Sequence, residues 1–503
     1  MNINLFKKYF FHSAAVHLPY HILLIFIVCL AAAGDLSAYN THKVFFENTD
    51  HELDVFRIFG EEPGKTLVLI GGIQGNEPGG YLAADRFVET KLKKGNLIVV
   101  PRANFYSILM NDRGINGDMN RKFDKVNLDD KDGLIIEKLK ELIKESDFLL
   151  NLHDGSGFYS PEWKSQNRNP KMYGQSIIAD CDSFYSKRYK KDFKIGEMAV
   201  KICNRVNARI KNQDHHFIFH NHRTEKKDTA HREQRKSLTY FALTKHQIPA
   251  FGIETSKSIT SKKSKVRYQT MIVKTFMDEF GIVEEENDIS LPEPLMEYLL
   301  ISINNGPPVA VYNNEELQIR KGDNIRIMHA EVNYQRGVSV NMVGQGSIND
   351  LKRDFIINNK TNVVVKKDST QCGSITIIPG NNISIKTDGR NNQIAYLIVM
   401  INNQNFALSP EECKNIKKGD TLKILDLIPY NEDPNDYVVN FKGFVGTRKT
   451  NNGEDRGYII DTSKKLLVKY SKKGNGKEYT IDVTKDEKLI TRFYVNILDP
   501  SSI

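Results

Sequence analysis

The stretch Thr66-Leu-Val-Leu-Ile70-Gly71-Gly-Ile-Gln74-Gly-Asn-Glu77-Pro78 decides the fold of the N-terminal half of this chain. Its first five residues form an uninterrupted apolar run, which is typical of a strand buried on both faces of a parallel sheet. Two glycines end the run, and Pro78 suits the first turn of a helix. We therefore expect a strand, a tight turn, and a helix that ends near Leu92.

Strand and helix signals alternate outward from this stretch, from about residue 42 to residue 280. Further strands are expected at 55–59, 97–100, 148–152 and 250–253, and further helices around 135–143 and over 266–280. The alternation predicts an α/β domain with a mostly parallel central sheet. In such sheets, functional sites form beyond the carboxyl ends of the strands.

The second half of the chain contains an internal repeat with a period of about 100 residues. Tyr298-Leu-Leu-Ile-Ser-Ile-Asn-Asn305 matches Tyr396-Leu-Ile-Val-Met-Ile-Asn-Asn403, and Ile319-Arg-Lys-Gly-Asp323 matches Ile416-Lys-Lys-Gly-Asp420. Each copy is a series of short alternating strands broken by Asn, Gly and Asp turns. The repeat predicts two tandem β-sandwich domains of immunoglobulin-like type. These domains could bind a polymer, attach the protein to a surface, or only cover the first domain.

The N-terminus has the features of a secretory signal peptide. Lys7 and Lys8 precede an apolar run over 22–33, and Leu36-Ser37-Ala38 follows as a cleavage site between small residues. The run is short for a membrane span and suits the apolar region of a signal peptide. We expect export to the periplasm, and an uncleaved N-terminal anchor is the alternative.

Charge and cysteine usage add weaker constraints. The chain of 503 residues has a formal net charge of +9, and its positive residues are spread along the sequence. This favours an anionic polymer or surface as a partner over nucleic acid, for which no binding motif is present. Four cysteines follow the signal peptide, Cys181, Cys203, Cys372 and Cys413, and they allow three pairings. Cys181 and Cys203 fall in one predicted domain and could pair, or the cysteines could be reduced and half-buried.

Three polar residues at two predicted strand ends suit a metal ion. Gln74 and Glu77 lie three residues apart in the turn after one strand, and His153-Asp154-Gly155 ends another. Two oxygen ligands and one imidazole can converge on zinc and leave a fourth position for water. The pattern therefore predicts one catalytic zinc ion bound by Gln74, Glu77 and His153.

These segments resemble the metallocarboxypeptidases related to pancreatic carboxypeptidase. Members of that family carry His-x-x-Glu, then a distant His, then a catalytic Glu near the end of the domain. The resemblance implies that Glu254, in Ile248-Pro-Ala-Phe-Gly-Ile-Glu254, is the catalytic base. It also implies that Arg113 polarises the scissile carbonyl, and that Asn120 and Arg121 bind the terminal carboxylate.

The main departure from the family is Gln74, which stands where the family has a histidine. The Gln-x-x-Glu signature, the signal peptide and the two β-rich domains resemble one branch, the peptidoglycan DL-carboxypeptidases that set helical cell shape in Gram-negative bacteria. In the family, the Asp before the Asn-Arg pair accepts a hydrogen bond from the metal-binding His. Asp118 holds that position here, and the Gln74 amide can donate to it in the same way.

The resemblance covers residues 42 to about 280, just under half of the chain, and implies a fold and a function for that part. We predict a signal peptide over 1–38, a mixed-sheet zinc carboxypeptidase domain over 42–282, and β-sandwich domains over 293–385 and 392–503. The expected reaction trims muramyl tripeptide stems of peptidoglycan to dipeptide and releases meso-diaminopimelate, which affects cell shape. The alternatives are an inactive peptidoglycan-binding protein, and a zinc amidase or deacylase on a small acyl amino acid.

Two features stay outside this assignment. His216, His220 and His222 would share one face of a strand, and could form a second metal site or a partly exposed wall of the cleft. The family often has a tyrosine on a loop before the catalytic Glu. Tyr240 is near in sequence but is predicted to lie on a helix, so no tyrosine is assigned.

Overall fold

The computed structural model describes residues 40–499, apart from 48, 286–290, 307, 381–393, 403, 430–432, 447–452 and 465. The predicted signal peptide, 1–38, lies outside the described residues. Among the residues that are described, no helix has both the length and the apolar character needed to cross a bilayer.

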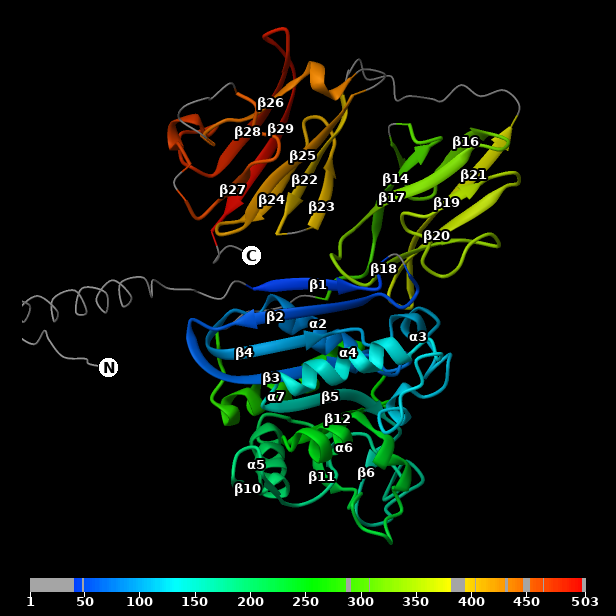
Figure 1. The fold of residues 1–503 in the computed structure, drawn as a ribbon, viewed down its shortest axis with the longest axis vertical. Helices are drawn as coiled ribbons and strands as arrows, with labels where there is room; N and C mark the ends of the chain where they lie inside the picture. Colours follow the sequence, from blue (N-terminus) through cyan, green and yellow to red (C-terminus); the bar gives the residue numbers. More distant parts are fainter. Residues whose placement is uncertain are drawn as a thin grey trace, which may run out of the picture.

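The N-terminal half is built on one mixed sheet (Figure 1). Its strands follow the order β1-β2-β4-β3-β5-β12-β8-β11, and β13 pairs with β4. The four central strands β4, β3, β5 and β12 are parallel, whereas β1, β2 and β8 make antiparallel pairs. The strands are β1 (Thr41–Phe45), β2 (Leu53–Phe59), β3 (Glu62–Gly71), β4 (Leu92–Val100), β5 (Phe148–Gly155), β8 (Ser176–Ala179), β11 (Ile218–Asn221), β12 (Ala250–Ser256) and β13 (Val283–Glu284). The mixed α/β sheet is therefore confirmed.

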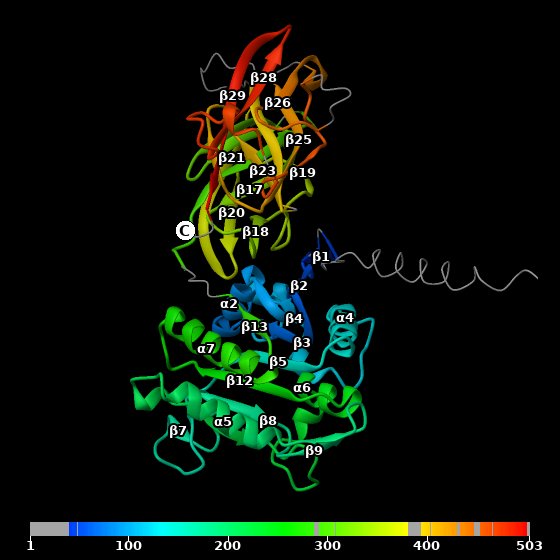
Figure 2. The same ribbon diagram turned by 90° about the vertical axis from the view of Figure 1, so that its left-hand side faces the viewer.

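Helices cover both faces of this sheet (Figure 2). One core contains residues of α2 (Pro78–Arg86), α5 (Ile195–Asn207) and α7 (Lys262–Phe280). The other contains residues of α4 (Gly133–Lys144) and α6 (Leu238–Phe241). Both faces of the central strands are thus buried, which explains their continuous apolar runs.

The prediction that the helix after Pro78 continues to about Leu92 is wrong. Helix α2 ends at Arg86, and a single 3₁₀ turn η1 (Phe87–Glu89) follows before β4 begins at Leu92. Phe87 and Leu92 are both buried in the same core. The chain must therefore turn between them to enter β4, and a continuous helix cannot place both side chains there.

Short elements occur both before β5 and between β5 and α7, in segments where the sequence has no clear periodicity. The short helices and strands of the domain are α3 (Phe105–Leu109), η2 (Met119–Arg121), β6 (Phe158–Tyr159), β7 (Arg168–Asn169), β9 (Phe184–Ser186), β10 (Lys191–Phe193), η3 (Gln213–His215), η4 (Arg232–Lys236) and the π-helical turn η5 (Ala242–His246).

The C-terminal half forms two β-sandwich units with the same strand order. In the first, β15-β14-β17-β19 faces β16-β21-β20-β18; in the second, β23-β22-β25-β27 faces β24-β29-β28-β26. Adding eight to each strand number of the first unit gives the second, as the internal repeat predicts. The strands of the first unit are β14 (Met296–Ile303), β15 (Val309–Tyr312), β16 (Glu316–Arg320), β17 (Asn324–Val332), β18 (Val338–Met342), β19 (Asp354–Ile356), β20 (Thr361–Lys367) and β21 (Thr370–Gly380).

The second unit contains two 3₁₀ turns in addition to its strands. Its elements are β22 (Ile394–Ile401), β23 (Gln404–Leu408), β24 (Cys413–Lys417), β25 (Thr421–Pro429), η6 (Pro434–Asp436), β26 (Val438–Phe441), β27 (Ile459–Asp461), η7 (Val468–Tyr470), β28 (Glu478–Lys485) and β29 (Lys488–Leu498). The two β units lie side by side on the same side of the first domain (Figure 1). Their repeated strands pack together, and Tyr298 donates its hydroxyl to the Ala407 carbonyl at 2.6 Å.

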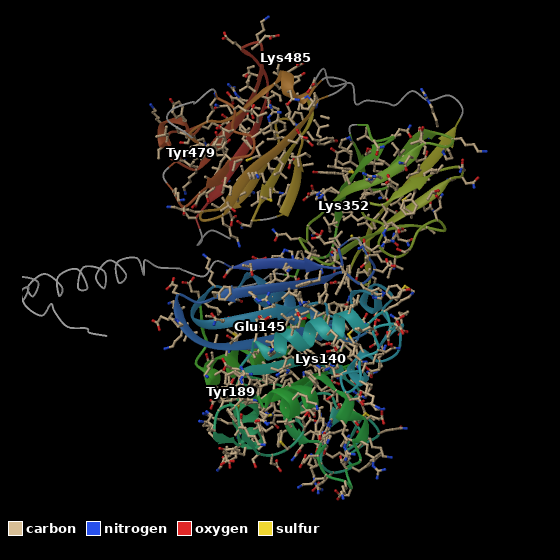
Figure 3. All side chains as sticks on the ribbon, viewed as in Figure 1. Lys140, Glu145, Tyr189, Lys352, Tyr479 and Lys485 are labelled. Carbon is tan, nitrogen blue, oxygen red and sulfur yellow. The ribbon has the colours of Figure 1, made fainter. Side chains whose placement is uncertain are left out.

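Lysines and free thiols occur in all three units of the structure. Lysines labelled in Figure 3 lie on all three units: Lys140 on the first, Lys352 on the second and Lys485 on the third. The four cysteines of the described residues are free thiols, with Cys181, Cys203 and Cys372 buried and Cys413 exposed. The structure thus has reduced cysteines, and Cys181 and Cys203 are not paired.

Candidate active site

The site lies where three parallel strands end at one edge of the sheet. Gly71 of β3 pairs with Leu152 of β5, and His153 of β5 pairs with Glu254 of β12. The residues that follow β3, and the last residues of β5 and β12, are therefore brought together. A cleft of about 250 Å³ opens there, and its lining includes all of the predicted site residues except Asp118.

Gln74, Glu77 and His153 form the floor of the cleft. Gln74 and Glu77 are each 3% exposed and His153 is 5% exposed, so all three are buried polar groups. His153 Nδ1 lies 2.8 Å from Glu77 Oε2. Burial raises the pKa of a carboxyl, but the hydrogen bond and charge of His153, together with the charges of Lys257 and Arg113, hold the pKa of Glu77 below its usual range.

Asp118 connects Gln74 to Arg113 by hydrogen bonds to both side chains. Gln74 donates Nε2 to Asp118 Oδ1 at 2.8 Å. Arg113 donates Nη2 to Asp118 Oδ2 at 3.0 Å and also lies 3.2 Å from Glu77 Oε1. Despite its burial, Asp118 has a lowered pKa, because Arg113 and the Gln74 amide favour the carboxylate. The amide nitrogen of Gln74 is therefore held by Asp118, which leaves its oxygen as the atom for an ion.

Glu254 projects from the end of β12 and is partly exposed in the cleft. Desolvation raises the pKa of its carboxyl, the charge of His153 opposes this effect, and the nearby Glu77 and Asp154 add to it. A carboxylate with a raised pKa can accept and return a proton near neutral pH. The geometry and the electrostatics therefore suit a general base.

Asn120 and Arg121 lie in the 3₁₀ turn η2 on the wall of the cleft. Asp118 caps this turn by accepting from the Asn120 backbone N–H at 3.0 Å. Asn120 accepts the Leu238 N–H on Oδ1 at 3.0 Å, so its amide NH₂ is the group left for a ligand. Arg121 Nη1 donates to the Asn120 carbonyl at 2.9 Å, which fixes the guanidinium.

Asp154, which follows His153, supports the site from behind. It is 1% exposed and accepts the Gly79 N–H at the start of α2 at 2.9 Å and Lys265 Nζ of α7 at 3.2 Å. It also accepts the Thr255 hydroxyl of β12. A Cβ on Gly79 would overlap Asp154, and this close approach explains the glycine after Pro78. Asp154 thus links two helices and two strands beneath the site.

Two cleft residues have no motif that could have predicted them. Lys257 Nζ lies 3.3 Å from Glu77 Oε1, and Tyr173 lines the cleft beside Arg121. Tyr173 belongs to a loop between β7 and β8 that is remote in sequence from every motif. Tyr240 lies on α6, as expected, and is not among the residues that line the cleft.

The histidine set expected on one strand face is partly wrong. Strand β11 begins at Ile218, and His216 precedes it with Nε2 3.0 Å from the Ile210 carbonyl oxygen. His220 and His222 do lie close together, and the third member is His231, from beyond a loop. His220 and His222 are 7% and 2% exposed, His231 is partly exposed, and His222 lines the cleft.

The donor set formed by Gln74, Glu77 and His153 fits a divalent metal ion. It offers one amide oxygen, one carboxylate and one imidazole from two neighbouring strand ends, all buried and all lining one cleft. Three protein ligands would leave a position for water, and Glu254 lines the same cleft. The arrangement can therefore support metal-assisted hydrolysis.

Comparison with known proteins gives one family match. A family described as "carboxypeptidase controlling helical cell shape catalytic" matches residues 47–301, which is half of the chain. No curated protein matches the chain.

Solved structures of the cell shape determinant protein Csd4 from Helicobacter pylori are similar in fold. The apo form shares 22% identity at a TM-score of 0.53, covering 89% of this chain and all of Csd4. The tripeptide-bound form shares 23% at 0.53 with the same coverage. The form bound to mDAP, described as a D,L-carboxypeptidase, shares 23% at 0.52 and covers 86% of this chain and 97% of Csd4.

Proposed function

Since the chain belongs to the family of carboxypeptidases that control helical cell shape, we propose that it is a periplasmic, zinc-dependent peptidoglycan DL-carboxypeptidase. It removes meso-diaminopimelate from muramyl tripeptide and leaves the dipeptide. The bond that breaks joins the side-chain carboxyl of D-glutamate to the amine of the last residue.

One observation carries the proposal. Gln74, Glu77, His153, Glu254 and Arg121 line a single cleft, although they come from four segments spread over 181 positions of the sequence (74 to 254). A protein that only binds peptidoglycan has no use for a buried metal donor set beside a proton acceptor. The arrangement favours hydrolysis over the binding-only alternative.

We assign the following roles. Zinc bound by Gln74, Glu77 and His153 would acidify a water molecule and polarise the scissile carbonyl. Glu254 takes a proton from the attacking water molecule and later gives a proton to the leaving amine. Arg113 stabilises the negative charge that develops on the carbonyl oxygen.

Arg121 and Asn120 bind the free carboxylate of the last residue. The guanidinium presents two parallel N–H groups that match a carboxylate, and the Asn120 amide adds a third donor. Meso-diaminopimelate has two carboxylates and two amines, and Lys257 and Arg113 add positive charge to the same cleft. The tripeptide-bound and mDAP-bound forms of Csd4 support a ligand of this class.

The remaining assignments concern location and domain organisation. The signal-peptide features of residues 1–38 support export to the periplasm. The proposed domains are a catalytic domain over 42–282 and two β-sandwich domains over 293–385 and 392–503. The β domains would position the catalytic domain on its polymeric substrate.

The test is digestion of a purified muropeptide panel with tri-, tetra- and pentapeptide stems, followed by liquid chromatography and mass spectrometry. Zinc-loaded protein is compared with Glu254→Gln, which keeps the shape of the side chain and removes the base. We expect tripeptide to become dipeptide, a loss of about 10²-fold or more in Glu254→Gln, and abolition by a chelator. Unchanged stems with zinc bound would favour the binding-only alternative. Cleavage of small acyl amino acids instead would favour the amidase.

A further inference from the structure

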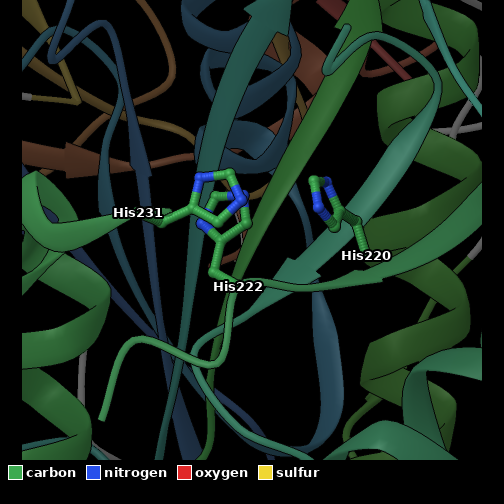
Figure 4. A group of neighbouring side chains, drawn as sticks. All are labelled: His220, His222 and His231. Atoms are coloured by element: carbon green, nitrogen blue, oxygen red, sulfur yellow. The ribbon is translucent and has the colours of Figure 1, made fainter. Parts of the chain in front are cut away.

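Three histidines outside the predicted zinc site converge beside the cleft (Figure 4). His220 lies on β11, His222 directly follows that strand, and His231 precedes η4. One ring nitrogen of each lies within 4.8 Å of those of the other two. The ring centroids are 4.6 Å apart for His220 and His222, 4.0 Å for His222 and His231, and 5.4 Å for His220 and His231.

Two of these rings have a buried nitrogen that accepts or donates no hydrogen bond among the residues that the structure describes. His220 is 7% exposed and His222 is 2% exposed. His220 Nδ1 and His222 Nε2 have no hydrogen-bond partner within the described part of the chain. Buried polar atoms are almost always paired, and an unpaired one costs stability, so these nitrogens call for a ligand.

The chemistry of the group selects a metal ion. Burial lowers the pKa of all three imidazoles, to about 4 for His220, and therefore favours their neutral form. A neutral imidazole coordinates a metal without first losing a proton. Three imidazoles suit zinc and similar divalent transition ions, and disfavour calcium and magnesium, which prefer oxygen ligands.

The geometry needs only a local adjustment. Zinc–nitrogen bonds of 2.0–2.1 Å place tetrahedral ligands about 3.3 Å apart, so the rings must turn inward. His222 and His231 are stacked with an interplanar angle of 14°, and His231 is the partly exposed member, in a loop. Rotation of the His231 side chain would direct its nitrogen at the same ion. Tyr159 stacks on His220 with 3.9 Å between the ring centroids, and this contact holds the His220 ring in place.

The cluster adjoins the carboxylate-binding end of the cleft. His222 lines the cleft that contains Arg121 and Glu254. His231 lines a neighbouring hollow together with Arg121 and Tyr173, so the same two residues border both. An ion held by these rings would add positive charge, and an open coordination position, on the side of Arg121.

We propose that His220, His222 and His231 form a second site for a zinc-class divalent ion, with an open position that accepts a carboxylate oxygen of the substrate. The metal site stands on the histidine geometry alone. Its use as a substrate anchor rests on the proposed carboxypeptidase function.

Metal stoichiometry of the full-length protein tests the site. Dialysis against Zn²⁺, followed by elemental analysis, compares wild type with His153→Ala, His231→Gln and the double variant. Two ions per chain are expected in wild type, one in each single variant and none in the double variant. His216→Gln, a histidine of the same segment with a separate hydrogen bond, is the matched control and should keep two ions.

The Co²⁺ form adds a spectroscopic readout that does not depend on activity. In His153→Ala, the visible absorption of four-coordinate Co²⁺ should persist, and His231→Gln added to it should remove the signal or weaken Co²⁺ binding about tenfold or more. His220→Asn provides a second variant if His231→Gln proves unstable by circular dichroism. Unchanged stoichiometry and spectrum in both variants would overturn the proposal.

A separate experiment tests whether the second ion binds a carboxylate of the substrate. Adding meso-diaminopimelate to Co²⁺-loaded His153→Ala should shift the absorption, because a carboxylate enters the coordination sphere. An unchanged spectrum would refute anchoring. If stems are not hydrolysed but two ions bind, the proposed function fails and the second site stands.

Discussion

Gln74 depends on Asp118 for its orientation, because the hydrogen bond of 2.8 Å between them fixes which end of the amide faces the ligand position. Asp118→Ala should therefore weaken zinc affinity by about 10- to 100-fold, measured by competition with a chromophoric chelator. Asp112→Ala changes an exposed aspartate of the same loop and should leave the affinity unchanged. Normal zinc content and turnover in Asp118→Ala would refute this role.

Asp180 makes stability depend on pH, because burial raises the pKa of its carboxyl from 3.8 to about 6. Between these values the folded protein keeps a proton that the unfolded chain releases, so stability falls as pH rises from about 4 to 6. The loss reaches about 3 kcal/mol above pH 6. In urea melts, Asp180→Asn should show a shallower fall over this window. A pH profile parallel to that of wild type would contradict the assignment.

Residues at strand ends could be predicted from sequence, whereas residues on loops could not. Gln74, Glu77 and His153 follow apolar runs, and the topology of a parallel sheet brings such ends together. Tyr173 reaches the cleft, and His231 reaches the neighbouring hollow, through irregular segments that no periodicity describes. Strand alternation predicts that His216 shares a face with His220 and His222, but β11 begins at Ile218, two residues after His216.

At the scale of elements, the ion pair between Asp154 and Lys265 connects α7 to the end of β5 below the site. Lys265 Nζ lies 3.2 Å from Asp154 Oδ2, and the two side chains are 8% and 0% exposed. Lys265→Met should lower the unfolding free energy by about 3 kcal/mol at neutral pH, because it leaves a buried carboxylate unpaired. Burial already raises the pKa of Asp154, so the loss should shrink in acid, where the carboxyl is protonated.

The control is Lys263→Met, which changes an exposed lysine in the same helical turn and should cost less than about 0.5 kcal/mol. Chemical denaturation of both variants at neutral and acidic pH provides the comparison. Equal costs for the two lysines would show that the buried pair does not hold the helix.

The long periodic elements could be predicted, and the short ones could not. Helix α4 was predicted from Ile135, Ile136 and Leu139, which are buried, and the runs in β3, β5 and β12 were recognised as buried strands. Strands β6, β7, β9 and β10 contain two or three residues each. Such strands have too few residues to show alternation, and tertiary contacts alone define them.

For the molecule as a whole, a buried ionic cluster joins the catalytic domain to the first β unit. Arg102 contacts Asp85 within its own domain at 2.8 Å and Asp368 of the β unit, and Arg336 of the β unit reaches Asp85 at 2.9 Å. Lys367 contacts Asp368 and is 3% exposed. The two parts should therefore unfold together.

Asp368→Ala should split the joint unfolding transition of the catalytic domain and the first β unit into two. The substitution leaves Lys367 and Arg102 buried without their shared carboxylate. We expect a loss of about 3–5 kcal/mol and two calorimetric peaks in place of one. Asp354→Ala removes the partner of Arg326 in an exposed pair of the same unit and should leave the single transition unchanged, because exposed ion pairs contribute little to stability. An unshifted single transition in Asp368→Ala would contradict the coupling.

The β units themselves were predictable as a repeat, and their identical strand orders follow from it. Their contact with the catalytic domain was not predictable, because Asp85, Arg102, Arg336 and Asp368 carry no pattern that distinguishes them from surface charges. Only the folded arrangement places these four residues together.

The most direct test of the proposed reaction is mass spectrometry of the products formed from synthetic muramyl tripeptide in water labelled with heavy oxygen. Hydrolysis at the predicted bond places one labelled oxygen in the side-chain carboxyl of D-glutamate in the dipeptide, and none in the released meso-diaminopimelate. Glu254→Gln should yield almost no labelled dipeptide. Intact tripeptide, or label in a different carboxyl, would contradict the account.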